Sequence, residues 1–232
     1  MNRLADPLPG EGLPRAVVFD MDGLLLDSER IALACFEQAA RALGAPWREE
    51  VGLSLVGLNA RDSDRLIATA FGADFPLEAL RCDFGARYDA CVAAGGIPLK
   101  PGVEELFEAL RGWGIPCALA TSTHRARAEA KLARAGLLPG FRASACGDEV
   151  RHGKPAPEIY ELAARRLGVA PAGCLALEDS NAGIRAALAA GMRAIMVPDL
   201  LAPAPDVRAA AVPVMASLHE VRLSLAALAS RR

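Results

Sequence analysis

Residues 17–29 of the 232-residue chain read VVFDMDGLLLDSE, an apolar run that ends in Asp20 and Asp22 with a glycine directly after them. A short apolar run rich in β-branched residues predicts a buried strand. The two aspartates allow two interpretations. Asp and Gly are common turn residues, so the strand could simply stop there; alternatively, the fold requires clustered negative charge at this point.

Four further segments share this apolar pattern and are predicted to be strands of the same sheet. They are CALAT (from Cys117), RASAC (142–146), CLALED (from Cys174) and AIMVP (194–198). Apolar residues at helical spacing predict helices between these strands, within residues 101–114, 155–168 and 179–191. Alternating strands and helices predict an α/β fold, with a doubly wound parallel sheet covered by helices on both faces.

The segment from 28 to 96 differs from the remainder of the chain. It contains no convincing strand, but it has three helical patterns of apolar residues, each ending at a glycine. We therefore expect a small all-α domain of residues 28–96, inserted into an α/β core formed by residues 1–27 and 97–232. Its two connections, near Ser28 and Pro98, are predicted hinges.

Composition argues against several classes of function. Apolar residues make up 53% of the chain and the formal net charge is −2, which predicts a folded core without a basic surface for nucleic acid. No segment approaches the about 18 apolar residues of a membrane span, and the N-terminus lacks the apolar centre of a signal peptide. The six cysteines form no close pair typical of a metal or redox site. We expect small buried cysteines in a reduced, cytoplasmic protein, with a monomer as the default state.

Polar residues stand where the predicted strands end. These residues are Asp20 and Asp22, Thr121 and Ser122, Lys154, and Glu178 and Asp179. In an open parallel sheet, ligands bind at the carboxyl ends of the strands. Clustered carboxylates require a cation, and a set of oxygen ligands without His or Cys favours Mg²⁺. A cation beside a lysine, a threonine and loop amides is a suitable setting for a phosphoryl group.

Two further features narrow the chemistry. If the strand conformation continues past Asp20, the side chains of Asp20 and Asp22 share one face about 7 Å apart, which favours two different roles around one substrate atom. Lysine is scarce, since the chain has only Lys100, Lys131 and Lys154. Any step that needs an amine therefore has few candidates.

Four segments, in order along residues 16–215, resemble the motifs of the haloacid dehalogenase superfamily. DMDGLLLDSE (20–29) is similar to the first motif, Asp-x-Asp-Gly, and ALATST (118–123) to the second, a strand ending in Thr or Ser. HGKPAPEIY (152–160) resembles the third motif and LALEDSNAGI (175–184) the fourth. One Asp-x-Asp-Gly alone is weak evidence, but four motifs at matching strand ends favour a functional site over a simple turn. The resemblance implies a Rossmann-like core with a helical cap.

The resemblance also implies roles for the acidic residues. Asp20 would be the nucleophile that forms an aspartyl phosphate. Asp22 would be the general acid and base, protonating the leaving oxygen and then activating water. Mg²⁺ would be held by the Asp20 carboxylate, the Asp22 carbonyl and Asp179. Glu178 would assist through water.

Other motif residues would bind the phosphoryl group. By resemblance, Thr121 and the Ser122 amide would hold phosphoryl oxygens, and Lys154 would balance the negative charge near Asp20. Gly23 would give the backbone room to turn beside the phosphate. The implied partner is a small phosphorylated metabolite.

Candidate substrate contacts also lie outside these motif positions. Asn59 and Arg61 lie in the inserted segment and could touch substrate, although a loop arginine is more commonly a solvated surface residue. Thr123 and His124, just past the second motif, could contact the far side of the substrate. His124 is equally compatible with an exposed position at the start of a helix.

Within the superfamily, the resemblance separates reaction classes. Dehalogenases lack an aspartate at position 22, because a carbon–halogen bond needs no proton on the leaving group. Phosphonate hydrolases use a lysine of the cap, and this chain has no lysine between residues 28 and 99. The prediction is therefore a Mg²⁺-dependent phosphatase, a phosphoric monoester hydrolase acting on a sugar phosphate.

Two related activities remain as alternatives. The β-phosphoglucomutase branch carries a cap histidine where Ala32 stands here, and an arginine where Ala60 stands, with Arg61 shifted by one. Both departures favour a phosphatase over a mutase. Phosphoglycolate phosphatases often begin Asp-Gly-Thr-Leu, so Leu24 and Leu25 favour phosphosugars mildly.

Two non-enzymatic interpretations are weaker. Receiver domains of response regulators also combine an acidic cluster, a Thr or Ser and a lysine around Mg²⁺. They are shorter, however, with an adjacent acidic pair and no helical insert. A non-catalytic family member is the other interpretation, but this chain fills every motif position.

Overall fold

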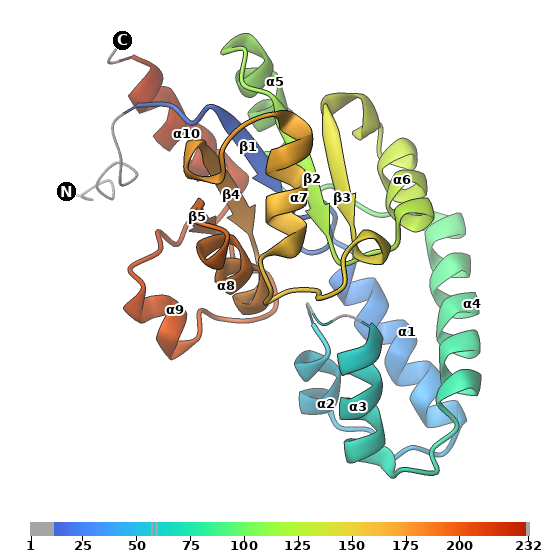
Figure 1. The fold of residues 1–232 in the computed structure, drawn as a ribbon. Helices are drawn as coiled ribbons and strands as arrows, with labels where there is room; N and C mark the ends of the chain where they lie inside the picture. The colour runs from blue at the N-terminus through green and yellow to red at the C-terminus, as the bar shows by residue number, and fades with distance from the viewer. Residues whose placement is uncertain (1–11, 57, 59, 231–232) are drawn as a thin grey trace, which may run out of the picture.

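The computed structural model describes residues 12–56, 58 and 60–230 (Figure 1). Within them, five strands form one parallel sheet in the order β3-β2-β1-β4-β5. The strands are β1 (Ala16–Phe19), β2 (Cys117–Thr121), β3 (Ala143–Cys146), β4 (Cys174–Glu178) and β5 (Arg193–Met196). All five predicted strands and the predicted α/β class are confirmed. The first strand is central, so its carboxyl end lies between those of β2 and β4.

The two faces of the sheet carry side chains of different size. One face presents mainly large residues to the core, namely Val17, Phe19, Leu119, Leu175 and Leu177. The opposite face presents mainly small ones, namely Ala16, Val18, Ala118, Ala120 and Ala176. Because small side chains let a helix approach closely, α7 (Glu158–Leu167) contacts β1, β2 and β3 together.

Helices cover both faces of the sheet, as predicted (Figure 1). The large-residue face packs against α5 (Val103–Gly112), α6 (Arg125–Arg134) and α10 (Leu218–Ala229). The small-residue face packs against α7, α8 (Asn181–Ala189) and α9 (Pro205–Ala209). The helices predicted between the strands correspond to α5, α7 and α8. The pattern did not predict α6, which buries only Ala128 and Leu132 and so has little apolar periodicity, nor α9 and α10.

Local sequence rules explain where the predicted helices begin and end. Ser180 caps α8, since its Oγ accepts a hydrogen bond from the backbone N–H of Gly183 at 3.0 Å. The helix α7 ends at Gly168, whose φ of 70° lies in the left-handed region that glycine adopts easily. These boundaries place the loops that follow β4 and precede α7 at the carboxyl edge of the sheet.

Four helices separate β1 from α5 and lie together beside the sheet (Figure 1). They are α1 (Glu29–Ala42), α2 (Glu49–Ser54), α3 (Ala60–Phe71) and α4 (Leu77–Gly95), and we call them the helical insert. They share a small apolar cluster of their own around Ala39, Ala40, Ile67 and Leu80. The additional helix is α2, which is too short for a periodic pattern.

The two connections between the helical insert and the sheet run side by side. The backbone N–H of Asp27 donates to the carbonyl of Pro98 at 2.8 Å, and that of Lys100 donates to the carbonyl of Leu25 at 2.9 Å. Leu26 and Leu99 form an isolated antiparallel bridge between these hydrogen bonds. The chain therefore enters and leaves the insert through one short, paired crossing.

The cysteines correct one expectation. All six are free thiols, and Cys35, Cys117, Cys146 and Cys174 are buried as predicted. Cys82 and Cys91 are exposed, because both lie on solvent-facing positions of α4. Among the described residues, no helix is both long enough and apolar enough to cross a membrane.

Candidate active site

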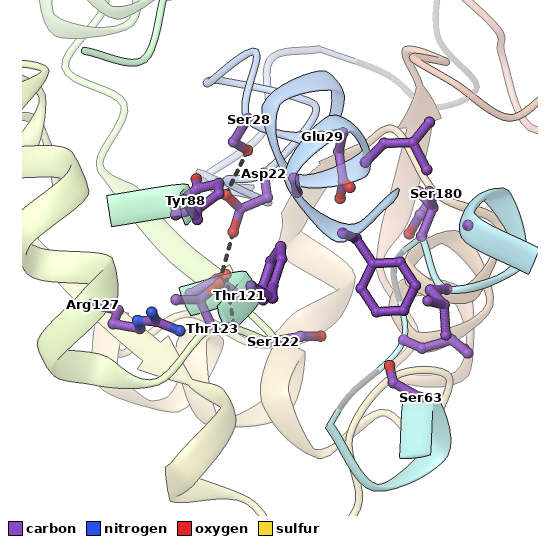
Figure 2. Close-up of a pocket in the computed structure, with 18 of the residues that line it drawn as sticks. Asp22, Ser28, Glu29, Ser63, Tyr88, Thr121, Ser122, Thr123, Arg127 and Ser180 are labelled. Atoms are coloured by element: carbon purple, nitrogen blue, oxygen red, sulfur yellow. Dashed lines mark hydrogen bonds between the residues drawn. The ribbon is translucent and has the colours of Figure 1, made fainter. Parts of the chain in front are cut away.

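A cavity of about 460 Å³ lies between the carboxyl edge of the sheet and the helical insert (Figure 2). Its sheet side is polar and includes Asp20, Asp22, Thr121, Ser122, Thr123, Lys131, Lys154 and Asp179. Its insert side is mostly apolar and includes Ala32, Leu33, Phe36, Leu55, Ile67, Phe84 and Tyr88. A charged surface therefore faces an apolar one across the cavity.

Asp20 and Lys154 form the buried centre of the sheet side. Asp20 follows β1 directly, and its backbone N–H donates to the carbonyl of Leu177 at 3.0 Å. The Lys154 ammonium donates to Asp20 Oδ1 at 2.5 Å, to Glu178 Oε1 at 2.5 Å and to the Ala120 carbonyl at 3.0 Å. Burial raises the pKa of Asp20 to about 7; the charge of Lys154 opposes this shift and that of Glu178 adds to it. Lys154 thus has an acceptor for each of its three N–H donors.

Glu178 holds Lys154 in place. It is completely buried, and its carboxylate also accepts hydrogen bonds from Tyr160 Oη at 2.6 Å and Ser180 Oγ at 3.0 Å. The helix α8 begins against this carboxylate, because a Cβ atom on Gly183 would lie only 1.8 Å from Glu178 Oε1. Glycine at position 183 therefore allows the close approach of helix and carboxylate.

Asp179 differs from its neighbours in having no partner in the described part of the chain. It is buried, and among the described residues its carboxylate makes no hydrogen bond or ion pair. Carboxylate oxygens of Asp20, Glu178 and Asp179 lie within 4.8 Å of one another. Burial, together with the charges of Asp20 and Glu178, raises the pKa of Asp179 well above its usual range. A buried cluster of oxygen ligands with one unpartnered carboxylate fits a hard divalent cation such as Mg²⁺.

Gly23 makes room for this carboxylate. Its φ of 88° is rare for other residues, and a Cβ atom there would lie 2.2 Å from Asp179 Oδ2. The glycine of the first motif is thus required by the tight turn and by the approach of Asp179. The predicted role of Gly23, to let the backbone turn beside a phosphate, stays a prediction.

Asp22 has a different environment from Asp20. Ser28 Oγ donates to Asp22 Oδ1 at 2.6 Å, and Thr123 Oγ1 donates to Oδ2 at 2.7 Å (Figure 2). The Lys131 ammonium also donates to Asp22 Oδ1, at 2.6 Å. Burial opposes ionisation, but the charge of Lys131 and these hydrogen bonds lower the pKa of Asp22 below its usual value. The pKa values of the two aspartates therefore shift in opposite directions.

The structure brings most of the predicted site residues together. Those that line the cavity are Asp20, Asp22, Thr121, Ser122, Thr123, Lys154 and Asp179. Glu178 contacts Lys154, and Gly23 lies beside Asp179. His124 and Arg61 are exposed and do not line the cavity, and Asn59 lies outside the described residues.

Several residues that line the cavity lie outside the four sequence motifs. Lys131 and Tyr88 lie beside Asp22, while Arg81 lines the insert side and pairs with Asp64. The scarcity of lysine drew attention to Lys131, but no spacing rule connects it to Asp22. These contacts depend on how α4 and α6 pack, which local sequence patterns do not report.

This fold and site define an α/β protein whose ligand crevice lies at the carboxyl edge of a parallel sheet, beneath a helical insert. The model of the family described as haloacid dehalogenase-like hydrolase matches residues 14–191, and the chain belongs to this family of hydrolases. The predicted resemblance is confirmed.

Known relatives agree with this assignment. The chain is 34% identical to Protein CbbY of Rhodobacter capsulatus over 203 residues, which cover 79% of this chain and 85% of the relative. It is also 34% identical to the phosphorylated carbohydrates phosphatase of Thermotoga maritima over 180 residues, which cover 78% of this chain and 83% of that protein. The predicted enzyme class, a phosphoric monoester hydrolase, is confirmed by this relationship.

Solved structures show the same fold. The crystal structure of CbbY from Rhodobacter sphaeroides in complex with phosphate is similar to this chain, with a TM-score of 0.75 and 31% identity. The similarity covers 90% of this chain and 96% of CbbY. It therefore includes both the sheet and the helical insert.

Proposed function

We propose that this protein is a Mg²⁺-dependent phosphatase that hydrolyses a small phosphorylated carbohydrate through an aspartyl phosphate on Asp20. The observation that carries the proposal is the buried centre of the site: one oxygen of Asp20 accepts a hydrogen bond from Lys154, and the unpartnered carboxylate of Asp179 lies close by. The relationship to a phosphatase of phosphorylated carbohydrates supports the substrate class.

The first step is attack by Asp20 on the phosphorus atom. A carboxylate oxygen of Asp20 forms a bond to phosphorus while the bond from phosphorus to the leaving oxygen breaks. Lys154 keeps Asp20 oriented and offsets negative charge beside it. Mg²⁺ would be held by Asp20, Asp179 and the Asp22 carbonyl, with Glu178 assisting through water, and would neutralise charge on the transferring group.

Asp22 transfers the protons in this proposal. It protonates the leaving oxygen in the first step and removes a proton from the attacking water in the second. Thr123 and Ser28 hold its two carboxylate oxygens in a fixed direction. Thr121 and the Ser122 amide, at the end of β2, are proposed to bind phosphoryl oxygens.

The helical insert is proposed to act as a cap, with boundaries at residues 28 and 96. The paired crossing at Asp27 and Pro98 is a suitable pivot, because few other backbone contacts join the insert to the sheet. Closure of the apolar insert side over the sheet side would exclude water from Asp20 while the leaving group is still bound.

Two features of the cavity favour a sugar-phosphate phosphatase over the related activities. Ala32 lines the cavity, so the position that carries a histidine in the mutase branch offers no group for proton transfer here. Glu29 points into the cavity (Figure 2) and has no partner among the described residues. A carboxyl group there suits the hydroxyls of a sugar better than the carboxylate of phosphoglycolate.

The test is a screen of phosphorylated metabolites, together with a generic aryl phosphate, with and without Mg²⁺. We expect hydrolysis that depends on Mg²⁺, highest kcat/KM for sugar phosphates, and loss of activity in Asp20→Asn. Activity that survives in Asp20→Asn would overturn the role of Asp20. Conversion of a hexose 1-phosphate into its 6-phosphate without phosphate release would replace the phosphatase with a mutase.

A further inference from the structure

Lys131 is a partly buried cation of the cavity to which the motifs assign no role. It lies on α6, its side chain is 16% exposed, and its ammonium donates to Asp22 Oδ1 at 2.6 Å. The ring of Tyr88, from α4 of the helical insert, lies 5.1 Å from the same nitrogen. An ammonium has three N–H donors, of which Asp22 accepts one and the side chain of Tyr88 interacts with a second. Since Lys131 lines the cavity, a donor remains for a ligand.

Lys131 is charged in this environment. Burial disfavours the charged form, but Asp22 and Tyr88 outweigh it and raise the pKa of Lys131. The ring of Tyr88 faces the ammonium and stabilises a cation there. The buried hydroxyl of Tyr88 interacts with Lys131 and makes no hydrogen bond to any other described residue. Lys131 therefore retains a donor on this wall of the cavity, which points to a ligand with an acceptor such as a hydroxyl group.

The position of this ammonium relative to the substrate follows from the role proposed for Asp22, so the inference rests on the proposed function. If Asp22 protonates the leaving oxygen, its carboxylate lies within hydrogen-bond distance of that oxygen. Two oxygens on adjacent carbons in a staggered gauche arrangement lie about 3 Å apart. Asp22 Oδ1 and Lys131 Nζ are 2.6 Å apart, a similar separation. Asp22 can thus contact the leaving oxygen while Lys131 contacts an oxygen on the adjacent carbon of the substrate.

We propose that Lys131 determines specificity by donating a hydrogen bond to a hydroxyl group on the carbon next to the phosphate ester carbon. The favoured ligand is a neutral hydroxyl rather than a carboxylate, because Asp22 already balances the charge of Lys131. Glu29 also lines the cavity, and its carboxyl group disfavours a second carboxylate beside it. The substrate class narrows to 2-hydroxyalkyl phosphates, which include many sugar phosphates.

Two isomers that differ only in the position of one hydroxyl test this proposal. We would measure kcat/KM with Mg²⁺ for 2-hydroxypropyl phosphate and 3-hydroxypropyl phosphate, both of them esters of a primary carbon. Wild-type enzyme should prefer the 2-hydroxy isomer, and Lys131→Met should reduce this preference by about 10-fold or more, as expected for a lost hydrogen bond to a charged donor. Any general damage to Asp22 lowers both values and cancels in the ratio.

Arg134→Met is the matched control on the same helix. Arg134 donates to the carbonyl of Ala93 in α4 at 3.0 Å, so this variant loses a contact between α6 and the helical insert without touching Asp22. It should leave the ratio unchanged, whereas Lys131→Arg, which retains a donor, should keep part of the preference. Lys131→Leu, which also lacks a donor, replaces Lys131→Met if the latter does not fold.

The outcomes distinguish a wrong role for Lys131 from a wrong proposed function. An unchanged ratio in Lys131→Met, or equal rates for the two isomers in wild-type enzyme, would overturn the role of Lys131 alone. A larger loss for 2-phosphoglycolate than for the 2-hydroxy isomer would overturn the hydroxyl assignment in favour of a carboxylate. Folded wild-type enzyme that hydrolyses no phosphate ester with Mg²⁺ would instead contradict the proposed function.

Discussion

The two sides of the cavity are built in different ways. On the sheet side, the central charged groups Asp20, Lys154 and Glu178 are buried and tied to strand ends, as the three acceptors of Lys154 illustrate. On the insert side, side chains such as Leu33, Phe36 and Phe84 present apolar surface from helices that have their own small core. The buried centre of the sheet side is therefore suited to a fixed reaction, whereas the insert side can vary and, together with Lys131, select the substrate.

The largest effect is expected on the sheet side, at Lys154. We expect Lys154→Met to lower kcat/KM by about 10²- to 10³-fold for every substrate, because it removes the cation that offsets charge beside Asp20. It also leaves Asp20 and Glu178 buried without their partner, so the protein should unfold at lower temperature. Steady-state kinetics and thermal melts measure both effects.

Lys100→Met provides the control for this variant. Lys100 pairs with Asp199 at 2.8 Å and does not line the cavity. Its removal should leave kcat/KM close to that of the wild-type enzyme. Wild-type activity in Lys154→Met would contradict the role assigned to the buried centre of the sheet side.

The second prediction concerns the cation. Mg²⁺ at a hundred times its Kd should stabilise the wild-type fold by about 2.7 kcal/mol, provided that it binds only the folded state. Asp179→Asn should abolish this stabilisation, because it removes the unpartnered buried carboxylate. Without Mg²⁺, the variant should be at least as stable as wild type, since an isolated buried charge is unfavourable. Thermal melts with and without Mg²⁺ measure this independently of activity, and equal Mg²⁺-dependent shifts in both proteins would exclude Asp179 as a ligand.

The third prediction concerns Glu149, whose ion pairs are expected to stabilise the fold without affecting catalysis. Hydrogen bonds from Arg166, and also from Arg125 and the Cys146 amide, lower the pKa of Glu149 to about 2. Burial of the carboxylate opposes this shift but does not outweigh it. A lowered pKa stabilises the fold above the usual carboxyl pKa of 4.5, and the stabilisation is lost as pH falls through about 2. We expect Glu149→Gln to reduce the free energy of unfolding by about 1 to 2 kcal/mol near pH 7, allowing for solvent screening.

Urea unfolding at several pH values checks this prediction. The difference between Glu149→Gln and wild type should shrink steadily as pH falls from 5 towards 2. Activity at pH 7 should not change, because Glu149 does not line the cavity. A difference that stays constant with pH would show that these ion pairs contribute nothing beyond packing.

The smallest effect is expected on the insert side. Phe84→Leu alters the cavity wall while keeping an apolar side chain, so it should change KM by about 3- to 10-fold for some substrates and leave kcat for aryl phosphates nearly unchanged. Phe71→Leu, in the same apolar cluster but outside the cavity lining, is its control. A uniform fall in kcat in Phe84→Leu would show that the insert side takes part in the reaction itself.

The same contrast explains how much could be predicted from the sequence. Asp20, Thr121 and Asp179 follow directly from strands that the apolar pattern predicts, because parallel strands bring their carboxyl ends to one edge. The partners of Asp22 depend on packing. Lys131 reaches it from α6, a helix with weak periodicity, and Tyr88 covers Lys131 from the insert.

The apolar pattern also could not predict short helices or the direction of individual loop side chains. The helix α2 has only six residues, of which Val51 and Gly52 are buried, so no periodic signal could develop. The proposed contacts of Arg61 and His124 rested on proximity in sequence to the insert loop and the second motif. Both side chains are exposed outside the cavity lining, because a helix that starts at an edge turns successive residues in different directions.

The central claim is that Asp20 attacks and Asp22 moves protons, and trapping the intermediate tests it most directly. Asp22→Asn cannot activate water in the second step, so incubation with Mg²⁺ and an aryl phosphate, whose leaving group needs little protonation, should accumulate phosphoenzyme. Rapid quenching and peptide mapping by mass spectrometry should find one phosphoryl group, on Asp20. Phosphorylation at another residue, or none in a variant that still releases the aryl alcohol, would contradict the account.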